Sequence, residues 1–166
     1  MKIAVTGKIG SGKSTTSKIL AKLLGLPVIS GDELGYEAIE YPEVKVALVK
    51  VFGKSILDEK GRIVRQELRK KAFKSKEALE KLNKIVHPTL LDLLKKQLSQ
   101  NTDVIVDAAL IHKWEIEDWF DVIIIIKANK SLRYKRARIE KNLIPLVEKN
   151  QPLRIKKSPK HFVVIN

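Results

Sequence analysis

The stretch with the clearest chemistry is GKIGSGKS, residues 7–14, in which Gly7 and Gly12, with four residues between them, precede a lysine and a serine. It follows an apolar run and opens a helical pattern, which is the context that a phosphate-binding loop requires. Glycine lets the backbone wrap closely around an anion with its N–H groups pointing inward. The following helix adds the positive end of its dipole, so the loop predicts a nucleoside triphosphate site rather than a chance glycine-rich turn. The predicted ATP-binding residues are Gly7, Lys8, Ile9, Gly10, Ser11, Gly12, Lys13, Ser14 and Thr15.

Two side chains of this loop have predicted roles beyond binding. Lys13 is long enough to reach the β- and γ-phosphates, so we expect it to be catalytic as well. The Ser14 hydroxyl is suited to Mg²⁺, and Asp107 ends an apolar strand in IVDAAL, where a second metal-ordering acid belongs. A helix-capping role for Asp107 stays open as an alternative. The expected cofactors are ATP and Mg²⁺.

Asp32 is the acid that points to transfer chemistry. It follows the second apolar run in VISGDELG, so it is expected at the same carboxyl edge of the sheet as Lys13. Phosphoryl transfer to an alcohol needs a carboxylate that accepts the hydroxyl proton and orients the oxygen. Asp32 is also a good N-cap for a helix starting at Glu33, and the two roles can coexist. We therefore predict Asp32 as catalytic base and as an acceptor-binding residue.

The elements that must position these groups alternate along the chain. Fully apolar runs separated by helical patterns are typical of a parallel sheet covered on both faces, so we predict an α/β, three-layer α/β/α fold with about five strands. The expected strands are residues 2–6, 27–29, 103–107, 121–126 and 161–165.

Between the second and third expected strands lies a long region with helical patterns only. Helices are expected at 43–53 and 66–73, followed by a long pattern from about 76 to 100 that Pro88 is expected to break. A basic helix is expected over 131–141. The strand-free region is interpreted as an insertion at the carboxyl edge of the sheet, where open α/β sheets bind ligands.

Composition narrows the class of protein. At 166 residues, with 44% hydrophobic and 31% charged residues, the chain predicts one soluble globular domain. No apolar run approaches the roughly 20 residues that span a bilayer, and the N-terminus leads into a strand rather than resembling a signal peptide. The lack of cysteine agrees with a cytoplasmic location, and no membrane partner is expected.

The formal net charge of +14 admits three interpretations. Basic residues neutralise the phosphates of nucleic acid, those of small polyphosphates, or simply form a solvated surface. The basic clusters are spread along the chain, which has few aromatic residues for base stacking and no RNA-binding signature. Nucleic acid therefore ranks behind small polyphosphates as a partner.

Taken together, TGKIGSGKST, VISGDELG, FGKSILDEKGRIVRQELRKKAF, VHPTL, DAALI and VVIN resemble the dephospho-CoA kinases. The resemblance covers nearly the whole chain, and the ordered set is far more specific than the loop alone. It implies ATP-dependent phosphorylation of the ribose 3′-hydroxyl of dephospho-CoA, giving coenzyme A and ADP, on a fold of the nucleoside monophosphate kinase type. The implied single P-loop kinase domain has a core at 1–35, 101–130 and 155–166, a helical acceptor region at about 36–100, and a short lid at about 131–154.

The resemblance also implies roles for residues outside the loop. Arg65 and Arg69 would hold the acceptor, and His87 would shape the acceptor cleft, with a packed helix-capping histidine as the alternative. Three lid arginines would meet the ATP phosphates, with Arg136 acting as a catalytic residue. The other two are Arg138 and Arg154, and each arginine has the alternative of a solvated surface cation. Arg154 and Gln151, both in NQPLR, resemble the Q…R element that follows the lid in the family.

The sequence departs from the family pattern at several positions. Ser30 stands where the family has the first acid of its D-x-D, and Ala109-Leu110-Ile111 replaces P-L-L. These departures leave Lys13 and Asp32 intact. Two alternatives stay open: another nucleoside or nucleotide kinase of the same fold, and a catalytically weakened ATP-binding regulatory or nucleic-acid-binding protein.

Overall fold

The computed structural model describes residues 1–154 and 160–166, and the chain forms two compact units. The first unit comprises Met1–Gly31 with Gln97–Asn166, and the second comprises Asp32–Lys96. Of the core segment predicted at 155–166, residues 155–159 lie outside the described residues.

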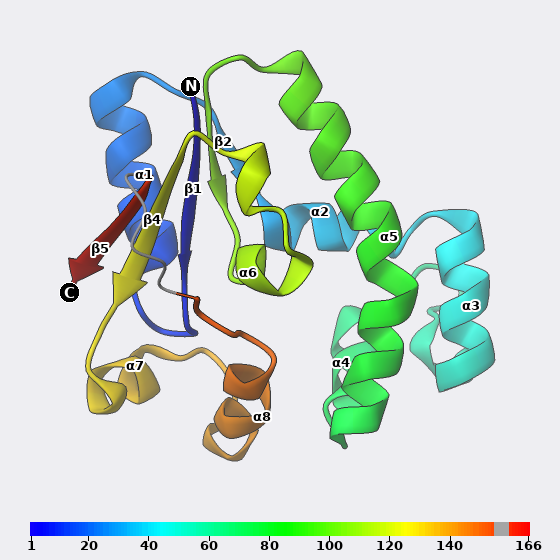
Figure 1. The fold of residues 1–166 in the computed structure, drawn as a ribbon. Helices are drawn as coiled ribbons and strands as arrows, with labels where there is room; N and C mark the ends of the chain where they lie inside the picture. Colours follow the sequence, from blue (N-terminus) through cyan, green and yellow to red (C-terminus); the bar gives the residue numbers. More distant parts are fainter. Residues whose placement is uncertain (155–159) are drawn as a thin grey trace. The chain divides into compact units, whose positions relative to one another are not determined.

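The first unit is built on a five-stranded parallel sheet with the order β2-β3-β1-β4-β5 (Figure 1). This sheet confirms the predicted α/β class. The strands are β1 (Lys2–Gly7), β2 (Val28–Ser30), β3 (Val104–Asp107), β4 (Val122–Lys127) and β5 (His161–Ile165). Because β2 is separated from β1 by β3, the chain must cross over between them, and helix α1 (Lys13–Leu24) makes that crossover.

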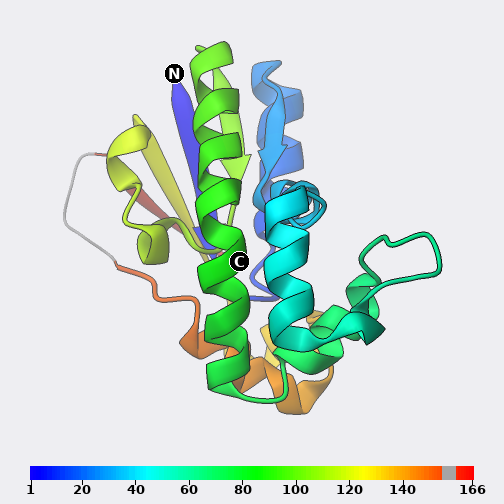
Figure 2. The ribbon, with the colours of Figure 1, turned by 90° about the vertical axis from the view of Figure 1, so that its right-hand side faces the viewer.

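Apolar strand residues form the core of this unit. Ile3, Val5, Ile105 and Ile126 are buried together on one face, where Leu20 of α1 packs against them. Burying one such side chain contributes about 1.5–3 kcal/mol, which explains why runs with almost no polar residue form these strands. Figure 2 shows α1 on one side of the sheet and the segment between β3 and β4 on the other. That segment contains α6 (Ile111–Trp114) and the 3-10 helix η2 (Glu117–Trp119).

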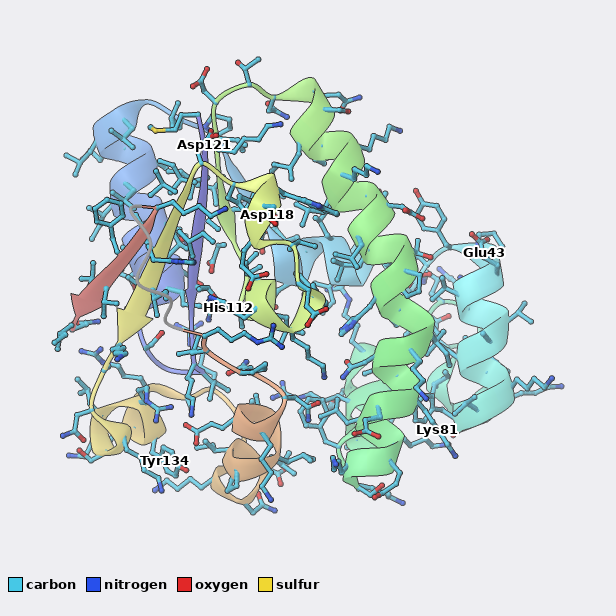
Figure 3. The ribbon with its side chains drawn as sticks, viewed as in Figure 1. Glu43, Lys81, His112, Asp118, Asp121 and Tyr134 are labelled. Carbon is cyan, nitrogen blue, oxygen red and sulfur yellow. The ribbon has the colours of Figure 1, made fainter. Side chains whose placement is uncertain are left out.

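A polar contact at the start of β4 fixes the beginning of the sheet. Asp121, labelled in Figure 3, accepts a hydrogen bond at 2.7 Å from the backbone N–H of Lys2. A carboxylate that accepts from a backbone N–H satisfies a donor that lies beyond the ladder of the sheet. The contact therefore sets where β1 and β4 begin relative to each other.

The sheet edge at β5 departs from the prediction of cover on both faces. Phe162, Val163, Val164 and Ile165 are all exposed, Ile165 at 83% of its surface. The apolar pattern therefore predicted the strand but not its exposed environment. No helix among the described residues is both long and apolar enough to cross a bilayer.

The predicted basic helix over 131–141 is wrong in its extent. Helix α7 covers only Lys130–Arg136, and Ala137 has an extended conformation with ψ 124°. The chain then forms the short helices η3 (Lys141–Leu143) and α8 (Ile144–Lys149). This path places Glu148 of α8 against Arg133 of α7, an ion pair that one continuous helix could not form, and Arg138 falls outside the helix.

The second unit is helical, as predicted for this region. Its helices are α2 (Gly31–Ala38), α3 (Pro42–Phe52), η1 (Lys54–Ile56), α4 (Arg65–Ala72) and α5 (Lys76–Gln100). The break expected at Pro88 is wrong, because α5 runs through it. Proline removes one backbone hydrogen bond, but buried Val86, Leu90 and Leu94 anchor the helix on both sides of it.

Candidate functional site

The predicted phosphate loop lies between the end of β1 at Gly7 and the start of α1 at Lys13. Gly10 and Gly12 have φ of 73° and 99°, in the left-handed region that favours glycine. The N–H of Ser11 donates to the carbonyl of Lys8 at 3.1 Å and closes the turn between them. The loop thus turns tightly at two positions where glycine is the residue that fits.

The start of α1 suits an anion. Ser14 and Thr15 are exposed in its first turn, and that turn contains no acidic side chain. The partial positive charge of the helix N-terminus is therefore left for a ligand, as in phosphate sites of this type. Lys13 is partly exposed at the same end of the helix.

Asp107 lies at the carboxyl edge of the sheet, as predicted. Parallel pairing sets it opposite Val5 of β1 on one side and opposite Ser30 of β2 on the other. The loop leaves β1 two residues after Val5, so the carboxylate belongs to the strand next to the loop. Within residues 1–154 and 160–166, no group of three or more potential metal-ligating side chains gathers. The predicted donors, the Ser14 hydroxyl and the Asp107 carboxylate, are oxygen ligands, which fit Mg²⁺ because that ion is typically held by one or two protein oxygens together with substrate phosphates.

The end of the described chain supports the loop from outside. The side-chain Nδ2 of Asn166 donates to the carbonyl of Ser11 at 3.1 Å, and its backbone N–H donates to the carbonyl of Lys127 at 2.8 Å. A Cβ added at Gly12 would lie 2.5 Å from Asn166 Nδ2, so the loop and this side chain are in close contact. Sequence reasoning missed this role, because 152 residues or more separate the two segments and only the VVIN element of the resemblance marked the position.

Replacing Asn166 with alanine is expected to weaken ATP binding. One lost hydrogen bond contributes about 0.5–1.5 kcal/mol, which corresponds to a roughly 3- to 10-fold rise in the KM for ATP. Steady-state kinetics with ATP varied would measure it, with Ile165→Ala as control, since that exposed side chain lies next to Asn166. An unchanged KM for ATP would show that Asn166 does not support the loop in ATP binding.

The segment predicted as the lid, at about 131–154, contacts the loop at Ile9. The Oε1 of Gln151 accepts the N–H of Ile9 at 2.8 Å, and Arg133 Nη1 lies 3.5 Å from the carbonyl of the same residue. Arg133 was not predicted, because a buried arginine looks like any other member of a basic cluster. Arg154 instead pairs with Glu115 at 3.1 Å, with both side chains more than half exposed. Such a pair is worth little, so it does not prevent Arg154 from turning toward a nucleotide.

The other predicted lid residues are exposed. Arg136 ends α7 and Arg138 follows it. Their assignment to ATP phosphates stays a prediction. Three lid arginines are predicted to meet ATP. Among the described residues, Arg154 is the only one of the three that forms an ion pair.

The helical unit contains a cavity of about 700 Å³. This volume lies within the roughly 300–1,000 Å³ typical of small-molecule sites. Its wall includes Arg65, whose guanidinium lies 4.0 Å above the ring centre of Tyr36. The cavity is lined by Glu33, Tyr36, Glu37, Glu40, Tyr41, Pro42 and Arg65.

The other predicted acceptor residues lie elsewhere in the helical unit. Arg69 is one turn after Arg65 in α4, with its guanidinium 5.5 Å from the centre of the Phe73 ring. His87 is partly buried in α5. Neither belongs to the wall of the cavity as the described residues form it. Asp32 is exposed in the first turn of α2, one residue before Glu33 of the cavity.

The helix start also changes the alternative role of Asp32. Helix α2 begins at Gly31, so Asp32 is its second residue and not the N-cap of a helix starting at Glu33. The capping interpretation in that form is wrong. A carboxylate in the first turn still interacts favourably with the helix dipole.

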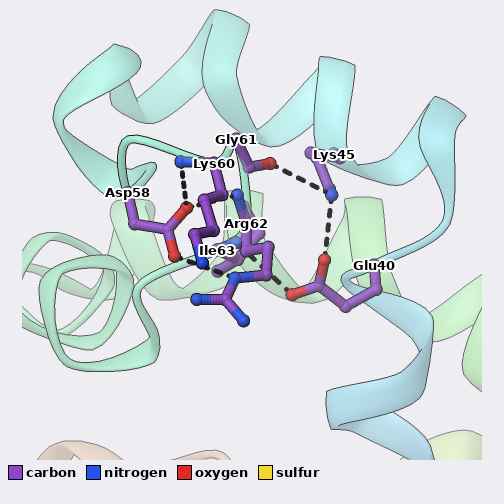
Figure 4. A network of polar contacts seen from close by, with 7 residues as sticks. All are labelled: Glu40, Lys45, Asp58, Lys60, Gly61, Arg62 and Ile63. Atoms are coloured by element: carbon purple, nitrogen blue, oxygen red, sulfur yellow. Dashed lines mark hydrogen bonds and ion pairs between the residues drawn. The ribbon is translucent and has the colours of Figure 1, made fainter.

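A polar network holds the segment that leads into Arg65 (Figure 4). Glu40 accepts the N–H of Ile63 at 3.3 Å and pairs with Lys45 at 2.9 Å. Lys45 in turn donates to the carbonyl of Gly61 at 3.2 Å. Because Glu40 also lines the cavity, one side chain connects the cavity wall to the segment that positions Arg65.

The turn in this segment is closed by Asp58. Its carboxylate accepts the backbone N–H groups of Arg62 at 2.8 Å and of Lys60 at 2.9 Å. The hydrogen bond from the Arg62 backbone, followed by that from the Arg62 side chain, holds the pKa of Asp58 below its usual value. Gly61 has φ of 70°, in the left-handed region that favours glycine.

Comparison with known proteins identifies the family of this chain. Residues 1–154 match the model of the family described as dephospho-CoA kinase. The chain belongs to the dephospho-CoA kinase family. It is 39% identical over 156 residues to the dephospho-CoA kinase of Borreliella burgdorferi, covering 90% of this chain and 75% of that protein.

Solved structures agree with the fold of this dephospho-CoA kinase family member. The crystal structure of TT1252 from Thermus thermophilus has a TM-score of 0.73 and 26% identity, covering 100% of this chain and 88% of that one. The dephospho-CoA kinase from Campylobacter jejuni has a TM-score of 0.61 and 23% identity, covering 99% and 87% respectively. The predicted family and P-loop kinase fold are thus confirmed.

Proposed function

We propose that this protein transfers the γ-phosphoryl group of ATP to the ribose 3′-hydroxyl of dephospho-CoA, giving coenzyme A and ADP. The observation that supports it most is the match of residues 1–154 to the dephospho-CoA kinase family, in a chain whose phosphate loop has the glycine conformations required. Its substrates are ATP and dephospho-CoA, without nucleic acid as a partner. We infer a cytoplasmic location from the lack of cysteine.

Each predicted site residue has a separate role in the proposed reaction. The loop amides and Lys13 hold the triphosphate and offset the charge that develops during transfer. Asp32 accepts the proton of the 3′-hydroxyl as its oxygen attacks. Arg136 moves in with the lid, while Arg138 and Arg154 contact the ATP phosphates. Mg²⁺, when bound, would be held by Ser14 and Asp107 and would neutralise the phosphate oxygens.

The cavity in the helical unit is the proposed place of the acceptor. Arg65 is the single cation among the described residues that line it, and a guanidinium suits the diphosphate of dephospho-CoA because its fork of donors matches phosphate oxygens. Arg69 and His87 extend the acceptor site beyond this cavity in the proposal. Glu40 and Lys45 hold the segment before Arg65 in place.

A coupled ADP-release assay tests the function directly. Dephospho-CoA should accelerate ADP formation far above the background hydrolysis of ATP, whereas AMP, nucleosides and nucleic acid should not. Acceleration by a nucleoside instead would identify the related kinase class. Tight binding of nucleic acid at physiological salt without turnover would favour the regulatory alternative.

Replacing Arg65 with methionine is expected to raise the KM for dephospho-CoA by about 10- to 100-fold. A hydrogen bond to a charged group contributes about 1.5–3 kcal/mol, and methionine keeps much of the contact with the Tyr36 ring. The KM for ATP should stay unchanged in the same assay. Lys70→Met is the matched control, because Lys70 lies on the same helix and pairs with exposed Glu67. Equal KM values for dephospho-CoA in both variants would show that the acceptor does not bind in this cavity.

A further inference from the structure

The backbone of Ile9 is held on both of its polar groups by side chains from the lid segment. Its N–H donates to Gln151 at 2.8 Å, and its carbonyl lies 3.5 Å from Nη1 of Arg133. The next residue, Gly10, packs on the last turn of α7: a Cβ added to it would lie 2.2 Å from the carbonyl oxygen of Arg133. The loop therefore rests on the lid segment over two consecutive residues.

Arg133 is itself fixed in place. Its side chain pairs with Glu148, and its Nε donates to the carbonyl of Ala128 at 3.1 Å. The side chains of Arg133 and Glu148 are only 10% and 14% exposed. A charged pair removed from water must be well satisfied by partners, and here the guanidinium uses its donors on Glu148, on Ala128 and on Ile9.

Gln151 is also positioned by its surroundings. It follows the C-terminal end of α8, where its N–H donates to the carbonyl of Glu148 at 3.1 Å. The preceding Asn150 accepts from Lys113 Nζ at 2.7 Å and donates to the carbonyl of Leu146 at 3.1 Å. The side chain that accepts from Ile9 is thus carried by a well-bonded turn.

We propose that Arg133 and Gln151 are positioning residues for the ATP site, which set the conformation of the phosphate loop through Ile9. This inference rests on the proposed function, since it takes the loop to be the ATP site. A loop rich in glycine has many accessible conformations, and one of them presents its N–H groups to the phosphates. Side chains that hold Ile9 remove part of that freedom before the nucleotide arrives, which raises affinity.

A positioning role predicts that the two substrates are affected differently. Arg133 and Gln151 act through the loop, so their loss should weaken ATP binding and leave the KM for dephospho-CoA unchanged. A purely structural role in the lid would instead lower thermal stability and affect both substrates together. The two roles can therefore be separated by measuring both KM values and the melting temperature.

The decisive variant is Gln151→Met, which keeps the length of the side chain and removes the acceptor for the Ile9 N–H. We expect the Kd for Mg·ATP, measured by titration calorimetry, to rise about 3- to 10-fold, as for one lost hydrogen bond. Hydrogen exchange at the Ile9 amide should accelerate at the same time. Lys135→Met, an exposed change on α7, is the control and should alter neither quantity. An unchanged Kd in Gln151→Met would overturn the proposal for Gln151.

The role of Arg133 is tested by exchanging the charges. The double variant Arg133→Glu/Glu148→Arg keeps an ion pair between α7 and α8 but removes the guanidinium from beside Ile9. We expect it to bind Mg·ATP as weakly as Arg133→Met, with a melting temperature closer to that of the unmodified protein. Full recovery of ATP affinity in the double variant would show that Arg133 acts only through Glu148.

Calorimetric binding also separates this inference from the proposed function. If dephospho-CoA fails to accelerate ADP release but Mg·ATP binds and Gln151→Met weakens it, the proposed function falls and the positioning role stands. If dephospho-CoA accelerates ADP release and both Gln151→Met and Arg133→Met bind Mg·ATP normally, the proposed function is supported and the positioning role is wrong.

Discussion

An Asp32→Asn variant is expected to transfer the phosphoryl group roughly 10²- to 10⁴-fold more slowly, which is the usual contribution of a positioned general base. The amide cannot accept the proton of the 3′-hydroxyl, although it keeps the size of the side chain. ATP binding should stay largely intact, because Asp32 belongs to α2 and not to the phosphate loop. Turnover with saturating ATP and dephospho-CoA, together with the Kd for Mg·ATP, measures both effects.

Glu43→Gln is the matched control for Asp32. It removes an exposed carboxylate from the first turn of the next helix, α3, and therefore makes the same change in charge and a similar change in helix-dipole interaction, without touching the wall of the cavity. A slow Asp32→Asn beside a near-normal Glu43→Gln would support the role of base. Near-normal turnover in both would reassign Asp32 to the stability of α2.

Lys13→Ala is expected to weaken ATP binding and slow transfer together. The ammonium contacts the phosphates in the ground state and meets greater charge in the transition state, so both KM for ATP and kcat should change. Removing a donor of this kind lowers kcat by about 10²- to 10³-fold. Steady-state kinetics with ATP varied at saturating dephospho-CoA gives the two constants.

Lys22→Ala serves as the control for Lys13, since it removes an exposed lysine from the last turn of the same helix. Its kinetics should match those of the unmodified protein apart from a small loss of helix stability. If Lys13→Ala changed only the melting temperature, the loop would have to bind its anion through backbone groups alone.

Local features of the chain could be predicted with little error. The left-handed conformations of Gly10 and Gly12 and the start of α1 at Lys13 follow from steric rules that involve a few adjacent residues. The strands could be predicted for the same reason, because a short run of buried apolar residues is a local pattern. Asp107 was expected at the edge of the sheet, since it ends such a run.

The errors occurred where contacts between distant segments outweigh local preference. Helix α7 ends at Arg136 although the basic pattern continues, and this end lets Arg133 meet Glu148. Helix α5 continues through Pro88 because apolar burial on both sides outweighs one missing hydrogen bond. Neither the ion pair of Arg133 with Glu148 nor the burial of α5 can be predicted from a few adjacent residues.

The amino-acid order by itself determined the phosphate loop, the parallel α/β class and the candidate base, because each depends on residue type and near spacing. The tertiary structure decided which distant side chains support that chemistry: Asn166 on Ser11, Arg133 and Gln151 on Ile9, and Glu40 on the segment before Arg65. These contacts join residues from 23 to 155 positions apart, and only the folded chain brings their donors within hydrogen-bond distance of their acceptors.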